Sequence, residues 1–255
     1  MQVKFHWKSM RHVRKGLLTA LRLLIIVPLP GPREWEPRHA TKWFTAVGLL
    51  IGGAGAVLAL LLTALLPASV AAVVIVGYLT IVSGCLHLDG LADTADGLVG
   101  GRDREEALEI MRDSRIGSMG VAAVFCALAL KTSALFALGS EGLWKGALAL
   151  PLAGRVCMVL AAWFLPYARE GGGLGADFCQ SGGRWQTLVP VVLLAVVLPL
   201  VAGYRGMTAA AGSVGATIGF IALQDRYIGG ATGDTLGATC EVAEAFAAIG
   251  LSVTF

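Results

Sequence analysis

The sequence predicts an all-α protein, a polytopic helical bundle that is integral to a membrane. Of its 255 residues, 56% are hydrophobic and only 15% are charged, and the mean hydropathy is +0.74. A soluble domain carries charge on about a quarter of its residues. Long apolar runs recur along the chain, and a helix is the structure that satisfies the backbone of such a run within lipid.

Seven runs approach the roughly 20 residues that a helix needs to cross a bilayer. They are Phe44–Leu66, Ala68–Leu86, Ser118–Gly139, Leu143–Leu165, Thr187–Gly203, Met207–Leu223 and Leu236–Phe255. An eighth segment, Leu17–Leu29, is short, contains Arg22 and runs into a proline-rich turn. We interpret it as an interfacial or re-entrant segment. The sequence therefore predicts about seven transmembrane helices in a single membrane-embedded domain over residues 1–255.

Basic residues predict the orientation. If each of the seven runs crosses once, the segment before Phe44, which is rich in Lys and Arg, lies on the same side as residues 87–117, 166–186 and 224–235. The positive-inside rule places that side, and the N-terminus, in the cytoplasm. Most acidic residues fall on the same side although they were not used to orient the chain. We expect the active face to be cytoplasmic.

Three aspartates mark the start of the first cytoplasmic segment. Asp89, Asp93 and Asp96 are spaced by four and three residues, so on an α-helix they share one face. Like charges on one stripe repel each other. A hard divalent cation removes that penalty, and the stripe therefore predicts a Mg²⁺ site shared with a phosphorylated substrate. The plain alternative is a polar helix end that faces water.

Two further segments predict phosphate binding. Arg112 and Arg115 follow the aspartates, and two guanidinium groups beside a metal suit a diphosphate. A glycine-rich stretch with Thr232 and Gly233 precedes the last apolar run and can present backbone N–H groups to phosphate. Asp234 in the same stretch is a fourth candidate metal ligand. A flexible turn between spans is the alternative for this stretch.

Ionisable residues within apolar runs form a second group of candidates. Glu241 and Glu244 lie in the last run, and carboxylates within a span are costly and usually functional. Lys131 and Arg155 either bind an anionic substrate or pair with acids that hold helices together, and both interpretations stay open. His87 lies on the opposite side of the helix from the aspartates, so a role as a ligand requires a non-helical start.

The motifs resemble those of a known family. Residues 87–98 (HLDGLADTADGL), 112–117 (RDSRIG) and 230–234 (GATGD) are similar, in the same order, to the motifs of the cobalamin synthase family, whose members are adenosylcobinamide-GDP ribazoletransferases. The resemblance covers essentially the whole chain. It implies an enzyme of the bacterial cytoplasmic (inner) membrane that depends on Mg²⁺, its cofactor.

The resemblance also implies the reaction and the residues that perform it. α-Ribazole, or its 5′-phosphate, joins adenosylcobinamide-GDP, giving adenosylcobalamin or its 5′-phosphate and releasing GMP. Asp89, Asp93, Asp96 and Asp234 would bind the metal. The chemistry also needs an acid that is not fully occupied by metal to take the hydroxyl proton, and we expect Asp93 or Asp96 in that role. Beyond these substrates and the lipid bilayer, we expect no nucleic acid as a partner. A homo-oligomer, or association with other enzymes of the pathway, is compatible with the sequence but no residue specifies it.

Two other functions compete with this interpretation. CDP-alcohol phosphotransferases also place an aspartate cluster at the end of a span, but their motif carries an arginine after Asp-Gly, whereas this chain has Leu91-Ala92-Asp93-Thr94. A membrane transporter would also bury ionisable residues, and it often consists of two similar halves. The aspartate stripe has no second copy in this chain.

Overall fold

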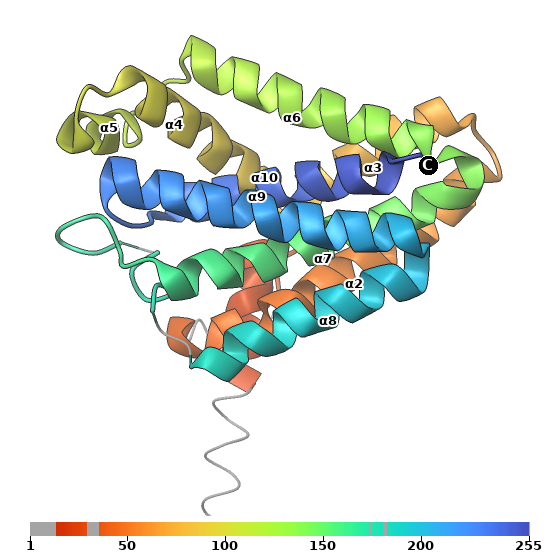
Figure 1. The fold of residues 1–255 in the computed structure, drawn as a ribbon, viewed down its shortest axis with the longest axis horizontal. Helices are drawn as coiled ribbons and strands as arrows, with labels where there is room; N and C mark the ends of the chain where they lie inside the picture. Colours follow the sequence, from red (N-terminus) through yellow and green to blue (C-terminus); the bar gives the residue numbers. More distant parts are fainter. Residues whose placement is uncertain (1–13, 30–35, 174, 181–182, 255) are drawn as a thin grey trace, which may run out of the picture.

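The computed structural model describes residues 14–29, 36–173, 175–180 and 183–254, and this part of the chain is a bundle of helices without β-strands. Figure 1 shows most of the helices running side by side. The named helices are α2 (Pro37–Thr63), α3 (Ala68–Val82), α4 (Leu86–Gly100), α5 (Arg104–Ile110), α6 (Ser118–Ala137), α7 (Gly139–Phe164), α8 (Arg184–Ala202), α9 (Tyr204–Ile228) and α10 (Gly233–Ser252). Residues 14–24 form a further short helix that precedes them. The prediction of an all-α bundle is confirmed.

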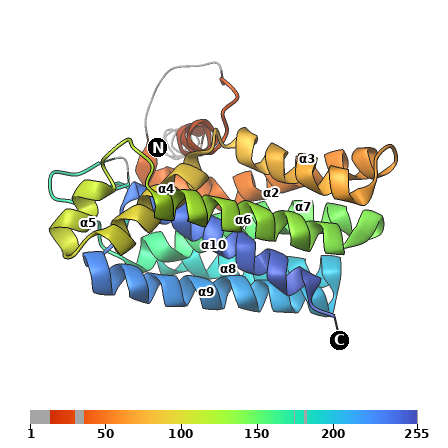
Figure 2. The same ribbon diagram turned by 90° about the horizontal axis from the view of Figure 1, so that it is seen from above.

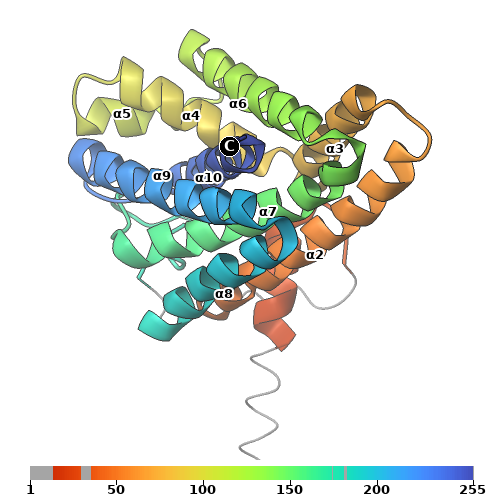
Figure 3. The same ribbon diagram turned by 45° about the vertical axis from the view of Figure 1, so that its right-hand side comes forward.

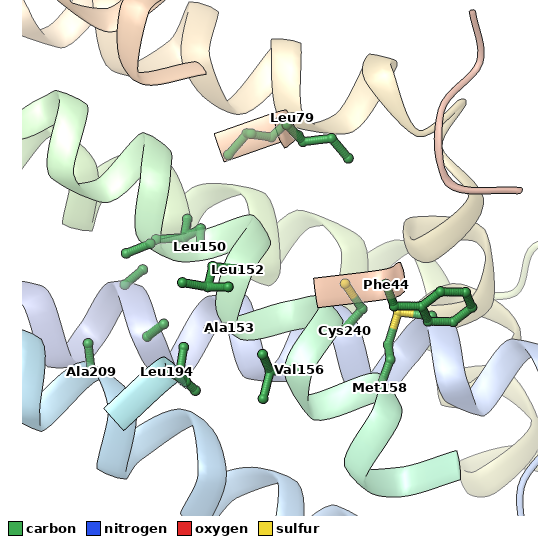
Figure 4. Packing of buried hydrophobic residues seen from close by; sticks show 14 of the residues in the cluster. Phe44, Leu79, Leu150, Leu152, Ala153, Val156, Met158, Leu194, Ala209 and Cys240 are labelled. Atoms are coloured by element: carbon green, nitrogen blue, oxygen red, sulfur yellow. The ribbon is translucent and has the colours of Figure 1, made fainter. Parts of the chain in front are cut away.

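Helices α7 and α10 form the centre of the bundle (Figure 3). Helix α7 contacts α2, α10, α8 and α9, and its residues 146–162 are buried almost without interruption. Many of the central side chains are small, which lets the helices approach closely. Figure 4 shows Leu150 and Val156 of α7 with Leu194 of α8 and Ala209 of α9 in this core.

Five helices are long and apolar enough to cross a membrane: α2, α6, α7, α8 and α9. Large apolar side chains point outward from them, including Leu61 on α2, Leu200 on α8 and Ile218 on α9. Such a surface is unfavourable in water and suits contact with lipid. We treat these five helices as the membrane-spanning segments, and the chain is a multi-pass membrane protein.

Two of the seven predicted spans differ from the prediction. The run Ala68–Leu86 is broken after Val82, and α4 leaves α3 at an angle of 85°. The break lies at Gly84 and Cys85, which both have left-handed backbone conformations (φ +61° and +60°) that a helix cannot include. If this bent pair is counted as one broken span, the total rises to six.

The last run forms α10, but this helix is not among the five. Its two buried glutamates lower its hydropathy, and neighbouring helices surround it (Figure 2). Helix α10 is therefore a central helix of the bundle that carries two buried glutamates, and its crossing of the membrane stays a prediction.

The N-terminal segment is only partly helical. Its helix ends at residue 24, and residues 25–29 have no regular structure. This agrees with a segment shorter than a span, and its interfacial or re-entrant position stays a prediction. The basic residues before residue 14 lie outside the described residues.

Three of the segments predicted to share one membrane face meet at one end of the bundle, on the left in Figure 1. Arg104 at the start of α5 joins them, because its Nε donates to the carbonyl of Ile228 (2.9 Å) and its Nη2 to the carbonyl of Ala168 (2.6 Å). We call this end, formed by residues 86–117, 165–173, 175–180 and 228–236, the site end.

Candidate active site

The break before α4 determines where the aspartate stripe lies. Because α4 turns away from α3, it crosses the N-terminus of α10 and not the middle of a span. Gly90 makes this crossing possible: a Cβ at this position would lie 2.5 Å from the carbonyl oxygen of Asp234. Asp89 is exposed on α4, whereas Asp93 and Asp96 are half-buried.

Asp96 is engaged by the protein. Its two carboxylate oxygens accept hydrogen bonds from the backbone N–H groups of Gly117 (2.7 Å) and Gly120 (2.8 Å). These groups belong to the first turn of α6, where backbone donors lack helical partners and a negative charge is favourable. Asp96 therefore caps α6 from a neighbouring helix.

Asp234 lies in the first turn of α10. Its carboxylate accepts a hydrogen bond from Nη2 of Arg169 (2.7 Å) and one from the hydroxyl of Thr232 (3.3 Å). Thr232 is fully buried and forms a capping box with Thr235, since each side chain accepts from the backbone N–H of the other. The hydroxyl of Thr232 therefore has a structural role, while Gly233 is exposed beside it.

The loop that carries Arg169 is fastened to the start of α10. Tyr167 and Ala231 form a parallel β-bridge, in which Ala231 N–H donates to Pro166 and Ala168 N–H to Ala231 (both 2.8 Å). Gly230 permits this approach, because a Cβ there would lie 2.4 Å from the carbonyl oxygen of Pro166. The bridge brings Arg169 within reach of Asp234.

The four predicted metal ligands share one region. Burial raises the pKa of Asp93 to about 6, and the carboxylates of Asp89, Asp234 and Asp96 raise it in the same direction. Within the described residues, Asp89 and Asp93 have no hydrogen bond or ion pair through their side chains. The region therefore holds two carboxylates with protein partners and two without.

In the part of the chain that the structure describes, no three His, Cys, Asp or Glu side chains converge closely enough to hold a metal ion. The donor set nevertheless fits Mg²⁺ in kind, because carboxylate oxygens are the ligands that this ion prefers. Asp96 uses both carboxylate oxygens to accept backbone N–H groups, whereas Asp234 engages only Oδ2, with Arg169 and Thr232. Asp234 therefore has an oxygen available for a metal in this conformation, while Asp96 would have to share or leave its partners.

A cavity of about 310 Å³ lies at the site end, between α4, α10 and the loop that follows α7. One part of its wall is polar and the other is apolar. The polar part comprises Asp89, Arg112, Arg169, Gly233 and Asp234, and the apolar part includes Leu23, Leu24, Phe44, Met158, Phe178 and Leu236. Figure 4 shows two of these apolar residues, Phe44 and Met158, next to each other. Such a cavity suits a ligand with an anionic group and a flat apolar group.

The two predicted phosphate-binding arginines are in different surroundings. Arg112 lines the cavity, and within the described residues its guanidinium has no partner. Arg115 is 87% exposed, does not line the cavity and pairs with Asp113. This hydrogen bond to Arg115 lowers the pKa of Asp113 to about 2. The structure therefore brings Arg112, but not Arg115, to the site.

Lys131 and Arg155 are both paired with acids. Lys131 Nζ lies 2.7 Å from Glu241 and 3.1 Å from Glu244, and Arg155 Nη1 lies 2.5 Å from Glu244. All four side chains are at most 6% exposed and none lines the cavity. The sequence leaves two interpretations open, and the structure shows one of them, the pairing with acids that joins α6, α7 and α10. Substrate binding by these cations stays a prediction.

His87 lies between the cavity and this buried group. It lines the cavity, is 2% exposed, and neither ring nitrogen has a hydrogen-bond partner among the described residues. It begins α4 in helical conformation, so it does not share the face of the aspartates.

Arg169 is the site residue that the sequence motifs do not indicate. It precedes three glycines, a composition that predicts only a flexible loop. Its proximity to Asp234 depends on the β-bridge between Tyr167 and Ala231, a contact between residues far apart in the chain.

The model of the cobalamin-5-phosphate synthase family matches residues 16–252. A relative from Syntrophobacter fumaroxidans, named adenosylcobinamide-GDP ribazoletransferase, is 40% identical over 89% of this chain and 93% of its own length. Relatives of the same name from Acetivibrio thermocellus (39% identical, 91% of this chain and 95% of the relative) and Chlorobium phaeovibrioides (38%, 94% and 98%) agree. No solved structure matches the chain. The chain therefore belongs to the cobalamin-5-phosphate synthase family.

Proposed function

We propose that the chain transfers the adenosylcobinamide phosphate group of adenosylcobinamide-GDP to α-ribazole or its 5′-phosphate. The products are adenosylcobalamin or its 5′-phosphate, and GMP. The family match over residues 16–252 and the shared name of the relatives support this reaction. The observation that carries it is the cavity at the site end, because carboxylates and arginines there face an apolar chamber large enough for an aromatic base.

The proposed step is an in-line displacement at phosphorus. A ribose hydroxyl of the ribazole attacks the phosphorus next to cobinamide, the bond from that phosphorus to the bridging oxygen breaks, and GMP leaves with the bridging oxygen. Such a step needs positioning and charge neutralisation more than covalent chemistry. Arg112 and Arg169 face the cavity and supply positive charge for the phosphate oxygens, and the exposed Gly233 leaves its backbone open to them.

Asp93 is the proposed general base. The Asp93 side chain has no hydrogen bond or ion pair among the described residues, so one of its oxygens can accept a proton while the other binds the metal. Both carboxylate oxygens of Asp96 already accept backbone hydrogen bonds, so this residue is less available to take the proton. The proton of the attacking hydroxyl therefore goes to Asp93.

Mg²⁺ is the proposed cofactor, held by Asp89, Asp93 and Asp234, with Asp96 as a further ligand once it leaves α6. When bound, it would supply positive charge to the diphosphate oxygens. The mutual repulsion that raises the pKa of Asp93 supports a cation in this region. Arg169 would then release Asp234 and bind the diphosphate.

The site end is proposed to face the cytoplasm, in the bacterial cytoplasmic membrane. The basic residues in the segments that form this end support the orientation, since cytoplasmic loops carry an excess of Lys and Arg. The N-terminus would lie on the same side, because α3 of the bent pair would then bring the chain back across the membrane between α2 and α6, as a sixth crossing.

Turnover by the full chain purified in detergent tests the proposal. The protein receives adenosylcobinamide-GDP, α-ribazole and Mg²⁺, and cobalamin and GMP are separated by chromatography. We expect both products in equal amounts, and a loss of about a hundredfold or more in Asp93→Asn or after removal of the metal. Asp225→Asn is the matched control, since Asp225 is exposed on α9 and lines no cavity. No product from folded protein would reject the proposed reaction.

A further inference from the structure

A second cavity adjoins the first. It has a volume of about 440 Å³ and lies between α5 and the loop that contains Arg169. Its lining residues are Arg104, Glu105, Leu108, Glu109, Arg112, Ala168, Arg169 and Glu170. Arg112 and Arg169 line both cavities, so the two arginines stand at the boundary between them.

The two cavities have opposite character. The first is mainly apolar beyond its polar rim, as described above. The second is lined almost entirely by charged side chains of both signs. A flat apolar base fits the first, whereas a ligand with many hydrogen-bond donors fits the second.

Several charged groups of the second cavity lack protein partners. Within the described residues, Glu109 and Glu170 form no ion pair, and neither does Arg112. Arg169 uses Nη2 for Asp234, while its buried Nε has no partner. Arg104 and Glu105, by contrast, pair with each other, and Arg104 also binds backbone carbonyls. The cavity therefore offers free carboxylates together with free guanidinium donors at its boundary.

The reaction requires two binding sites on opposite sides of the phosphorus. In an in-line displacement the attacking oxygen and the leaving oxygen lie roughly in line with the phosphorus between them. Arginines that bind phosphate oxygens at the boundary of two cavities match this arrangement: the nucleophile would enter from one cavity and the leaving group would occupy the other. The leaving group is a nucleoside monophosphate that carries guanine.

Guanine is the base that free carboxylates recognise. Its N1–H and exocyclic amine donate side by side and can both bind one carboxylate. Adenine presents an acceptor at N1, and hypoxanthine has the N1–H but no amine. We infer that the second cavity binds the guanosine part of the nucleotide substrate, with Glu109 and Glu170 as the residues that select guanine and Arg112 and Arg169 on its phosphates. This inference rests on the proposed function.

Binding of GMP, IMP and AMP to the detergent-purified full chain tests the inference. We expect GMP to bind about tenfold or more tightly than AMP, with IMP between them, because a hydrogen bond to a charged group contributes about a tenfold factor or more. In the double variant Glu109→Gln/Glu170→Gln, the three dissociation constants should become equal within about threefold. Each single variant shows which glutamate contributes more.

Two controls separate this effect from general damage. Glu141→Gln makes the same chemical change at the start of α7, at the opposite end of the bundle from both cavities. This variant should keep the preference for GMP. Inorganic diphosphate should compete for the boundary arginines equally in the parent and in the double variant, which shows that the variant is folded and that its phosphate end is intact.

The outcomes distinguish this inference from the proposed function. Equal binding of GMP and AMP by the parent, or a preference that persists in the double variant, would overturn the inference. A preference lost equally in Glu141→Gln would overturn it as well. Formation of cobalamin and GMP in the same samples tests the reaction separately. If both products form although these glutamates do not select guanine, the proposed reaction stands and only the assignment of the second cavity is rejected.

Discussion

The buried ion group in the middle of the bundle and the charged cavity at its site end use the same kinds of side chain. Lys131, Arg155, Glu241 and Glu244 form ion pairs with one another and are almost fully buried, although Nε and Nη2 of Arg155 have no hydrogen-bond partner among the described residues. At the site end Asp89, Asp93 and Arg112 have no protein partners among the described residues, although all of them lie at or near a cavity. Buried charges that pair with one another indicate a structural role, and charges at a cavity without a protein partner indicate a ligand.

The largest effect should come from breaking the buried ion group. In Lys131→Met, Glu241 loses its partner and Glu244 keeps only Arg155. An unpaired buried charge costs about 3–5 kcal/mol, so the free energy of unfolding should fall by that amount. Unfolding by a denaturing detergent, followed by circular dichroism, measures it.

A paired replacement sharpens this prediction. Lys131→Met/Glu241→Gln removes one charge of each sign and leaves Arg155 with Glu244. It should recover a large part of the lost stability, because a neutral pair of similar volume carries no uncompensated charge. A double variant that is no more stable than Lys131→Met would contradict the view that the group is held together by charge balance.

The sequence predicts these two regions unequally well. The sequence indicates the ion group, because its members are ionisable residues within apolar runs. Only the packing of helices α6, α7 and α10 side by side shows that these residues pair with one another. Most helix bounds follow from the apolar runs, because span length is a local property of the chain. The bend at Cys85 does not follow, since a residue other than glycine rarely adopts a left-handed conformation.

The site end depends more on contacts between distant segments. The spacing of Asp89, Asp93 and Asp96 places them on one helix, but only the fold shows that Asp96 caps α6. Arg169 enters the site through a bridge between residues 64 positions apart, Tyr167 and Ala231, which no local pattern indicates. The local motifs therefore predict which chemistry is present, and the long-range contacts determine which residues take part.

The next prediction compares two arginines of one motif. Arg112 lines both cavities, whereas Arg115 pairs with the exposed Asp113. In the turnover assay, Arg112→Ala should raise the KM for adenosylcobinamide-GDP by about tenfold or more, because a guanidinium–phosphate hydrogen bond is lost. Arg115→Ala should change it by less than about twofold, since exposed ion pairs contribute little. An equal rise in KM in both variants would show that the two arginines act as a pair, as the sequence alone suggests.

The smallest predicted effect separates two neighbouring aspartates of the stripe. Asp96→Asn removes the negative charge and one of the two acceptors at the start of α6, which should lower the free energy of unfolding by about 0.5–2 kcal/mol. Asp93→Asn removes a carboxylate that its neighbours repel, so it should leave stability unchanged or raise it slightly while turnover is lost. The same unfolding measurement on both variants, with Asp225→Asn as the control, checks this. If Asp93→Asn proved the less stable of the two, Asp93 would belong to the framework that holds the site end together, and the general base would have to be sought elsewhere on the stripe.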